Sequence, residues 1–597
     1  MSRVVAAVAA VVVVAACATG AVLTGGDDEG GSGAVALSTP GPWTPVAGTA
    51  FQEPEQIQRP PVDGPTDVVV DLHARSGLAT VAGSPIYART FNDEFVGPTI
   101  HARPGDTIKV TFDNDLGTND EDKLVPTNIH YHGLHVSPEG ISDNIFRTFK
   151  AKPDPENPYE SVVKLEDNQP RGTYWYHVHF HGISDGQIMG GLSGLIMLDG
   201  LTSLLPERFA DVPQRQMALR DVQLAKDGDG NPVVIDGYNA LADNKTIDPA
   251  DPVTRRMVNG LYKPDVTMQA NKWELWHFGN IGSDVYYKVA LAKQGAAKSA
   301  LDTQSFYVVA EDGVPVWEVW SGKELLIPPG KRLDVLVLGR AAGTYELLTL
   351  PYAQTSNNAM TKLKPIPCLP PEDDPGGACV PQSQVLATVT TTGDATQPPA
   401  PPSGRIAPEG DPTAVDLSKV HIADADKKTF TFDYPAGSTF VPVIYGDPPP
   451  QTDEEKREQA FEITQEPIIA PVLGATQEWT LVNKTRDDHP FHIHINGFQV
   501  TKTNEVTASN PDGNLVDYDA HGHQDVVNIP KARKVGDAVV NGKIVIRQKY
   551  LDFDGWYVFH CHILNHEDAG MMRTIQVRKD ANTPITPPPE AEDHEEH

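Results

Sequence analysis

The sequence predicts an all-β protein made of several consecutive domains. Short runs rich in β-branched residues, such as 67–72, 107–112 and 161–165, alternate with turn residues, and no long stretch keeps a helical period. The chain has 597 residues, whereas one domain usually takes about 100–200. Further strand-like runs at 273–278 and 332–338 and a third set beyond residue 413 indicate three β domains in series.

The amino terminus has the features of an export signal. Arg3 precedes an apolar run over residues 4–16, which is too short to span a bilayer but fits a signal-peptide core. The run ends at Cys17 in a context that resembles a bacterial lipobox. We therefore expect residues 1–17 to be a signal peptide with a lipobox and Cys17 to be acylated, which would anchor the protein to the outer face of the cell membrane. The alternative is cleavage without acylation, followed by secretion.

Composition divides the remaining chain. Residues 18–65 are rich in Gly, Pro, Ser and acidic residues, and a flexible tether is expected there. The prolines of residues 391–412 cannot donate ladder hydrogen bonds, so this segment is expected to be a linker. The predicted domains are 66–205, 206–390 and 413–580, and residues 581–597 are expected to form an acidic, disordered tail.

Charge and cysteine content restrict the functional classes. The chain carries 48 Lys and Arg against 80 Asp and Glu, a formal net charge of -32, which disfavours nucleic acid or anionic lipid as a partner and favours solubility. There are 4 Cys. Cys368 and Cys379 lie in a Pro- and Gly-rich loop, and export to an oxidising compartment favours a disulfide between them. Cys561 is then the odd cysteine.

Histidines are concentrated in four clusters, which hold eleven of the 20 in the chain. Side chains alternate across a strand, so both imidazoles of a His-X-His pair point to one face, at a separation suited to neighbouring metal sites. Imidazole suits copper, zinc, iron or nickel, so the pairs alone do not name the metal. The clusters comprise His130 and His132; His177, His179 and His181; His489, His492 and His494; and His560, His562 and His566.

Cys561 lies between His560 and His562, so alternation sends its sulfur to the face opposite the two imidazoles. One strand would then serve two metal sites. With His489, His566 and the thioether of Met571, the cysteine completes the two-His, Cys, Met ligand set of a blue-copper electron-transfer site. Zinc rarely takes a thioether, so copper is the expected metal.

These four motifs resemble the copper signatures of the multicopper oxidases, and the resemblance covers roughly residues 66–580. It implies three consecutive cupredoxin-like domains, each a Greek-key β-sandwich or barrel, and four copper ions per chain. It also implies one type 1, one type 2 and two type 3 coppers. In this pattern His489, Cys561, His566 and Met571 hold type 1 copper, and His130 and His492 hold type 2 copper. The type 3 pair is held by His132, His177, His179, His494, His560 and His562.

The resemblance further implies a route for electrons and protons. Electrons enter at type 1 copper and pass through Cys561 to His560 and His562, and dioxygen is reduced to water. Asp143 and Glu567 occupy positions like the acidic proton relays of relatives, but hydrogen bonding to a ligand imidazole is an equally good interpretation. His135, His181 and His277 are extra to the ligand pattern, and His277 is expected to be structural.

The electron donor is not determined by the motifs. We expect a laccase-like oxidase of phenols and aromatic amines. The first alternative is an oxidase of Cu(I), Fe(II) or Mn(II) ions. With only 9 Met and no Met-rich insert, the Cu(I) version is the weaker one. Another alternative is a non-enzymatic cupredoxin carrier or envelope scaffold, which complete type 2 and type 3 sets disfavour. The sequence leaves the oligomeric state open.

Overall fold

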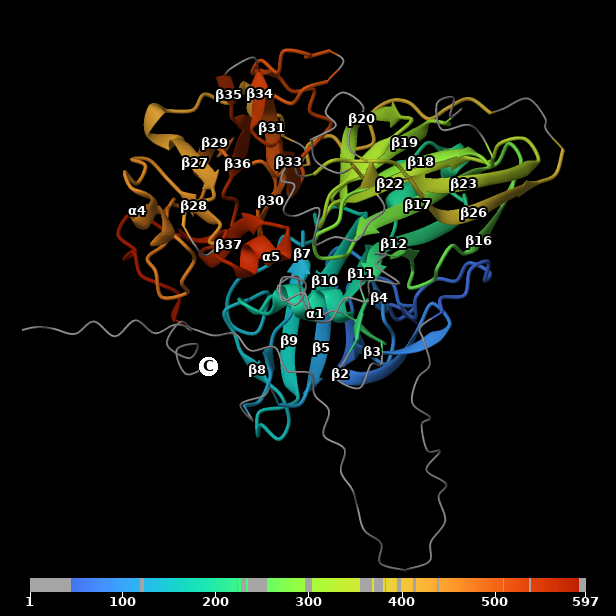
Figure 1. Cartoon of the computed structure of the whole chain (residues 1–597), viewed down its shortest axis with the longest axis horizontal. Coiled ribbons are helices and arrows are strands. Elements are labelled where there is room, and N and C mark those ends of the chain that lie inside the picture. The colour runs from blue at the N-terminus through green and yellow to red at the C-terminus, as the bar shows by residue number, and fades with distance from the viewer. Residues whose placement is uncertain are drawn as a thin grey trace, which may run out of the picture.

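In the computed structural model the chain folds into three pairs of facing β-sheets, which Figure 1 shows in blue to cyan, green to yellow and orange to red. This is the predicted all-β architecture of three domains. The three groups meet near the middle of the molecule, where β7, β10, α1 and α5 lie close together. The structure describes residues 44–118, 123–222, 224–226, 232–234, 255–295, 303–354, 368–369, 380–381, 383–394, 399–411, 415–437, 440–507, 509–535 and 538–589.

The first domain is a sandwich whose long strand β2 shows why these residues form strands. Val68, Val70 and Leu72 are buried, whereas Val69 and Asp71 between them face solvent, as expected for a strand with one face on the core. One sheet has the order β1 (Gln56–Ile57), β4 (Gly97–Ala102), β11 (Ser193–Leu198), β10 (Thr173–His177) and β7 (His130–His132). The facing sheet has the order β13 (Leu224–Lys226), β14 (Pro232–Val234), β3 (Ser84–Phe91), β2 (Asp67–Val81), β5 (Thr107–Asp115) and β9 (Tyr159–Lys164); β6 (Pro126–Thr127) pairs with β8 (Phe149–Lys150).

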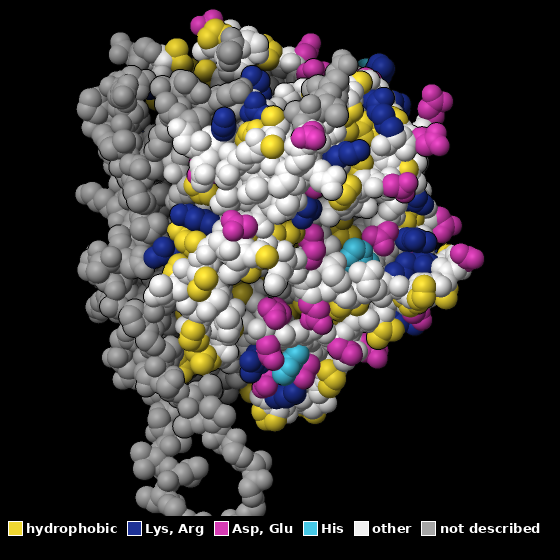
Figure 2. All heavy atoms as spheres, turned by 90° about the vertical axis from the view of Figure 1, so that its right-hand side faces the viewer, with side chains coloured by type: hydrophobic (Ala, Val, Ile, Leu, Met, Phe, Trp, Pro, Cys, Tyr) yellow, Lys and Arg dark blue, Asp and Glu magenta, His cyan; other side chains and the backbone are white. Residues whose placement is uncertain are grey.

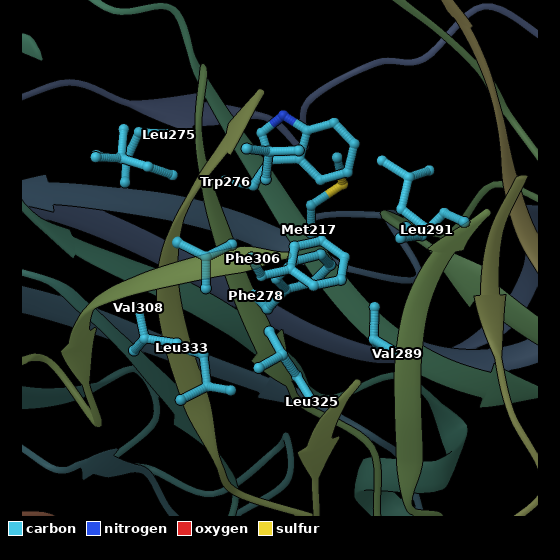
Figure 3. Packing of buried hydrophobic residues seen from close by; sticks show 14 of the residues in the cluster. Met217, Leu275, Trp276, Phe278, Val289, Leu291, Phe306, Val308, Leu325 and Leu333 are labelled. Atoms are coloured by element: carbon cyan, nitrogen blue, oxygen red, sulfur yellow. The ribbon is translucent and has the colours of Figure 1, made fainter. Parts of the chain in front are cut away.

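The second domain packs its sheets on a large apolar core, in which Trp276, Phe278 and Phe306 lie against one another (Figure 3). Its first sheet has the order β15 (Arg255–Val258), β12 (Gln214–Val222), β17 (Trp273–Asn280), β22 (Arg332–Leu338), β19 (Phe306–Glu311) and β20 (Val314–Gly322). Its second has the order β16 (Asp265–Gln269), β26 (Gln384–Thr392), β23 (Gly343–Thr349), β18 (Tyr287–Lys293) and β21 (Leu325–Ile327); β24 (Cys368–Leu369) pairs with β25 (Val380–Pro381).

The third domain carries the carboxyl-terminal histidine motifs. One sheet has the order β28 (Val443–Tyr445), β27 (Lys427–Asp433), β29 (Thr476–Asn483), β36 (Gly542–Lys549), β31 (Phe498–Thr503) and β32 (Val516–Asp517). The other has the order β33 (Val526–Ile529), β30 (His489–Ile493), β37 (Gly555–Cys561) and β38 (Met572–Val577); β34 (Arg533–Val535) pairs with β35 (Ala538–Val540).

Helices are few and short among the described residues. The α-helices are α1 (Ser184–Gly190), α4 (Asp453–Arg457) and α5 (Leu564–Asp568). The 3-10 turns are η1 (Leu201–Leu204), η2 (Glu207–Phe209), η5 (Leu417–Lys419) and η6 (Asp424–Asp426). None of the helices in these ranges has the length and apolar character required to cross a membrane.

Two strands that follow the predicted first domain in sequence join the edge of its β-sheet. β13 and β14 follow residue 205 in sequence, yet β14 runs parallel to β3 of the first domain, with Val233 opposite Tyr87. Joining a strand to an exposed edge satisfies its free backbone groups. The division at residue 205 is therefore not a clean separation in space, and the other predicted boundaries stay predictions.

Several predictions concern residues outside the described ranges. They include the signal peptide, Cys17, the tether up to residue 43 and the tail beyond residue 589. Cys368 begins β24, where its backbone pairs with Pro381, but Cys379 is not among the described residues, so the disulfide stays a prediction. On the face seen in Figure 2, acidic and basic side chains are interspersed instead of forming one acidic patch, which agrees with a general role of the charge in solubility.

Candidate metal centre

The four histidine motifs meet between the first and third domains. In the first domain, antiparallel pairing sets His177 of β10 opposite His130 of β7. In the third domain, His492 of β30 lies opposite His560 of β37. Because each pairing aligns the motifs of neighbouring strands, the first and third domains each present a compact group of imidazoles to the other.

The second histidine of three motifs lies just beyond a strand, and this differs from the strand-alternation argument. β10 ends at His177, β30 at Ile493 and β37 at Cys561, so His179, His494 and His562 follow where the chain leaves the sheet. Only His130 and His132 lie together on a strand, β7. Leaving the sheet lets these side chains turn towards the opposite domain.

Imidazoles of the two domains are in direct contact. His130 stacks on His494 with ring centroids 3.8 Å apart, and His132 stacks on His492 at 3.7 Å. The Nε2 atoms of His179 and His560 are 3.2 Å apart. All eight imidazoles are at most 1 % exposed, so a single buried site is formed by both domains.

The free nitrogens of this site provide a test of whether a metal fits it. His130 Nε2, His132 Nδ1, His177 Nε2 and His492 Nε2 are buried without a hydrogen-bond partner among the described residues, a costly state unless a ligand satisfies them. Their other ring nitrogens are bonded to protein acceptors. One ring nitrogen bonded to the protein and the other left for the metal is the usual arrangement of metal-binding histidines.

Burial also sets the protonation state that metals require. It lowers the pKa of His130, His177 and His560 well below the usual value, and the neighbouring imidazoles lower it further. A neutral imidazole has a lone pair for a metal, whereas a protonated one has none. Candidate ligand atoms lie within 4.8 Å of one another in sets such as His130, His132 and His177; His130, His492 and His494; and His179, His494 and His560.

A second, separate group surrounds Cys561. Its Sγ lies 3.2 Å from His489 Nδ1 and 3.6 Å from His566 Nδ1, and the three residues form one potential metal site. Met571 is fully buried beside them, with its backbone N–H donating to His566 O at 2.8 Å. Burial raises the pKa of the Cys561 thiol. The thiol therefore becomes a thiolate only when a bound metal ion stabilises the negative charge.

Outer hydrogen bonds orient the two histidines of this group. His489 Nε2 lies 2.7 Å from Thr485 Oγ1, and His566 Nε2 lies 3.3 Å from Tyr434 OH. The Tyr434 hydroxyl donates to Asp487 Oδ2 at 2.9 Å. The exposed ring of Phe440 is next to Tyr434 and His566. Sequence patterns do not reveal Tyr434 or Asp487, because neither belongs to a histidine motif.

Helix α5 connects the Cys561 site to the first domain. It carries His566, and its last residue Asp568 accepts hydrogen bonds from the backbone N–H groups of Gly182, Ser184 and Asp185. These groups lie at the beginning of α1, which follows the His177 and His179 motif. The helix is thereby fixed against the segment that supplies the other site.

The two predicted acidic residues are both at the centre. Asp143 is 2 % exposed and accepts a hydrogen bond from His130 Nδ1 at 2.9 Å. Glu567 is fully buried, with one oxygen 3.9 Å from His179 Nδ1 and neither oxygen hydrogen-bonded within the described residues. Burial raises the pKa of both carboxyls, that of Asp143 to about 8. Their use as proton relays stays a prediction.

The three extra histidines are placed outside the two groups. His135 contacts Ile495 O and Asp552 through its two nitrogens, and His181 packs on Phe461. His277 Nδ1 lies 2.6 Å from Asp334 Oδ1 inside the second domain. Asp525, by contrast, touches both His132 and His492, although it lies outside every motif and no sequence signal indicated it.

Comparisons with known proteins agree with this geometry. Models of the multicopper oxidase family match residues 74–202 and 435–581. A multicopper oxidase of Staphylococcus haemolyticus is 23 % identical over 503 residues, covering 82 % of this chain and 83 % of the relative. A laccase of Bacillus stratosphericus is 24 % identical over 527 residues, covering 82 % and 90 %.

Solved structures with a similar fold are also multicopper oxidases. The solved structure of a multicopper oxidase from Campylobacter jejuni, described as a metallo-oxidase, superposes with a TM-score of 0.63 at 18 % identity, covering 91 % of this chain and 98 % of that one. The three sandwiches are therefore cupredoxin-like domains. The two matched segments contain the ligand motifs of the first and third domains, and the chain belongs to the multicopper oxidase family.

Proposed function

We propose that the protein is a laccase-like oxidase that accepts single electrons from phenols or aromatic amines. Membership of the family makes it a copper-dependent oxidoreductase that binds four copper ions and uses dioxygen as electron acceptor. When bound, copper supplies the one-electron chemistry at the Cys561 site and the reduction of dioxygen at the three-metal site. The nature of the donor is the part that we propose.

Individual residues receive the following roles in the proposal. His489, Cys561, His566 and Met571 hold type 1 copper, and Cys561 connects this site covalently to its neighbours His560 and His562. His130 and His492 hold type 2 copper. The type 3 pair is held by His132, His177, His179, His494, His560 and His562. The unpartnered buried nitrogens and the short Sγ contacts of Cys561 support these assignments.

The aromatic surface beside His566 is the observation that favours an organic donor. Phe440 is 47 % exposed, and its ring centroid is 5.0 Å from that of Tyr434 and 5.8 Å from that of His566. An exposed aromatic ring offers stacking to an aromatic substrate. Since Tyr434 OH lies 3.3 Å from His566 Nε2, a donor stacked on this pair would be close to the type 1 ligand.

Asp487 favours the second candidate, a metal-ion oxidase. It is 3 % exposed, and its Oδ1 atom has no hydrogen-bond partner within the described part of the chain. A carboxylate suits hard ions such as Mn(II) better than soft ones. The relative from Campylobacter jejuni is described as a metallo-oxidase, whereas the relative from Bacillus stratosphericus is named a laccase.

Oxygen uptake by the copper-loaded protein tests the proposal, with a phenol, Cu(I), Fe(II) and Mn(II) compared as donors. We expect uptake with the phenol, an intense blue absorption band and loss of both in Cys561→Ser. Phe440→Ala should raise KM for the phenol about fivefold, since an aromatic contact is worth about 1 kcal/mol. Tyr87→Ala, which removes an exposed ring from the first domain, is the control.

Other outcomes would select an alternative. Uptake with metal ions alone, weakened by Asp487→Asn and not by Phe440→Ala, would replace the organic donor by a metal ion. A blue protein that consumes no oxygen with any donor and holds fewer than four coppers would indicate a carrier or scaffold.

We also propose export and lipid anchoring. The support is the predicted signal peptide with Cys17 at its end. In this proposal the wild-type protein is recovered from the membrane fraction, and Cys17→Ser moves it to the soluble extracytoplasmic fraction. Recovery of both proteins in the soluble fraction would favour secretion.

A further inference from the structure

The second domain reaches the three-metal site, although it contributes no histidine motif. The turn between β21 and β22 contains Gly330, whose φ of +82° favours glycine. A Cβ atom at this position would lie 2.9 Å from His562 Cδ2 and 3.1 Å from His132 Cε1. The backbone of this turn therefore forms part of the wall around the imidazoles.

Arg332, two residues later, connects all three domains. Its Nη1 and Nη2 atoms donate to Asp525 Oδ1 and Oδ2 of the third domain at 2.7 and 2.6 Å. Its Nε atom donates to Thr173 O of the first domain at 3.3 Å, and Nη2 also donates to Asp312 O at 2.9 Å. Arg332 is fully buried, and every donor atom is used, as a buried guanidinium requires.

Asp525 in turn contacts two stacked histidines by different atoms. Its Oδ1 accepts from His132 Nε2 at 3.0 Å, and its backbone carbonyl accepts from His492 Nδ1 at 2.9 Å. Neutral imidazole has one N–H, so each contact fixes the tautomer. The unpartnered nitrogen is then Nδ1 in His132 and Nε2 in His492, and both are left with a lone pair for metal.

Two further contacts fix Asp525 itself. Asp312 Oδ2, on the second domain, accepts from the backbone N–H groups of Asp525 and Val526 at 3.1 and 3.0 Å. Gly133, which follows His132, leaves room for the ion pair, since a Cβ atom there would lie 2.6 Å from Asp525 Oδ2 and collide with Arg332 Nη2. Asp525 is thus held through both its side chain and its backbone.

We propose that Arg332 and Asp525 are positioning residues of the three-copper cluster, through which the second domain fixes the metal-binding tautomers of His132 and His492. The inference rests on the copper centre and not on the identity of the electron donor. Its failure is therefore distinguishable from failure of the proposed laccase-like activity.

The test uses the full chain loaded with copper and the variants Arg332→Lys and Asp525→Asn. A lysine cannot make the bidentate contact, and an asparagine presents only one acceptor oxygen. We expect copper retention against a chelator to fall about 10- to 100-fold, the usual effect of losing a partner of a ligand histidine. The type 2 copper signal in electron paramagnetic resonance should change, while the blue band of the Cys561 site is retained.

Arg59→Lys is the matched control. Arg59 makes a buried bidentate pair with Asp106, at 2.6 and 3.1 Å, within the first domain. It should lower the melting temperature of the copper-free protein as Arg332→Lys does but leave copper retention and the type 2 signal unchanged. Wild-type retention and signal in Arg332→Lys or in Asp525→Asn would overturn the proposal, as would an equal loss in Arg59→Lys. Failure of both test variants to fold, with a folded control, would also count against it, because the pair would then be needed for folding as a whole.

Discussion

At the residue scale, four histidines of the cluster, His130, His132, His177 and His492, use their two ring nitrogens differently. One nitrogen meets a fixed protein acceptor, such as Asp143 for His130 or the backbone carbonyl of Val178 for His177. The other has no such partner and faces the group of imidazoles. The acceptor decides which ring nitrogen carries the proton and which keeps a lone pair for metal. Metal binding by these histidines therefore depends on residues that do not contact the metal themselves.

Asp143→Asn tests this dependence at His130. Asparagine keeps the shape of the side chain but accepts less strongly than a carboxylate, so copper binding or oxygen reduction should fall about 10- to 100-fold. Copper content and oxygen uptake would be measured together. Asp334→Asn is the control, because Asp334 makes a similar buried contact to His277. Equal behaviour of the two variants would mean that the Asp143 contact contributes only to folding.

The residues that hold metal were predictable from sequence, and those that orient them mostly were not. The histidine motifs are local patterns, and the chemistry of Cys561 between two histidines points to copper directly. Arg332 and Asp525 are 193 residues apart. Nothing in the spacing of an isolated arginine and an isolated aspartate predicts that two domains will bring them together.

At the scale of elements, α1 is held at both ends by other domains. Asp568 of the third domain accepts from three backbone N–H groups at its beginning. Arg220 of the second domain donates to Ile188 O and Met189 O at its end. A helix of 7 residues has little stability of its own, so these contacts fix its position.

Asp568→Asn should weaken this attachment. The amide cannot accept at its nitrogen, so at least one N–H at the beginning of α1 loses its partner, which costs about 1–3 kcal/mol. Denaturant unfolding of the copper-free protein would measure the loss. Thr452→Ala, which removes an exposed capping contact of α4, should cost about 1 kcal/mol. A smaller effect at Asp568 than at Thr452 would contradict the inferred role.

The strands were predictable because their apolar residues alternate or run continuously, and β22 begins and ends at the predicted residues 332 and 338. The short helices were not, because 5 or 7 residues give no helical period to detect. The pairing of β14 with β3 was also beyond sequence reasoning, since edge pairing between domains leaves no local pattern.

Asp416 offers a pH test at the turn η5, which begins the described part of the third domain. Burial opposes ionisation, but hydrogen bonds from Ser418, Lys419 and Gln499 outweigh it and lower the pKa of the carboxyl. A lowered folded-state pKa stabilises the fold at neutral pH, and this contribution disappears as the pH falls through the folded-state value. Asp416→Asn removes the charge that interacts with Lys419 and with the start of η5, so it should cost about 0.5–1 kcal/mol at neutral pH and progressively less in acid. An equal cost at all pH values would show that charge is not involved.

At the scale of the whole molecule, the three sandwiches have different roles around one buried site. The first and third domains supply the imidazoles in stacked pairs, and the second contributes the Gly330 turn and Arg332. The site therefore exists only when the domains are assembled. The histidine motifs fall in the predicted domains 66–205 and 413–580, so the sequence located the ligands, whereas the predicted second domain, 206–390, contains no histidine motif that would indicate its contribution.

Copper should act as a cross-link between domains, and its removal tests this arrangement. A ligand that binds only the assembled state raises stability by RT ln(1 + [L]/Kd), or about 4 kcal/mol when its concentration is 1,000 times Kd. The melting temperature of the copper-loaded protein should therefore exceed that of the chelator-treated protein. Cys561→Ser separates the two sites, because His489, Cys561, His566 and Met571 all belong to the third domain. This variant should keep most of the copper-dependent increase, since the imidazoles shared between domains remain. If the increase disappears in Cys561→Ser, the stabilisation comes from the third domain alone and the cross-link is absent.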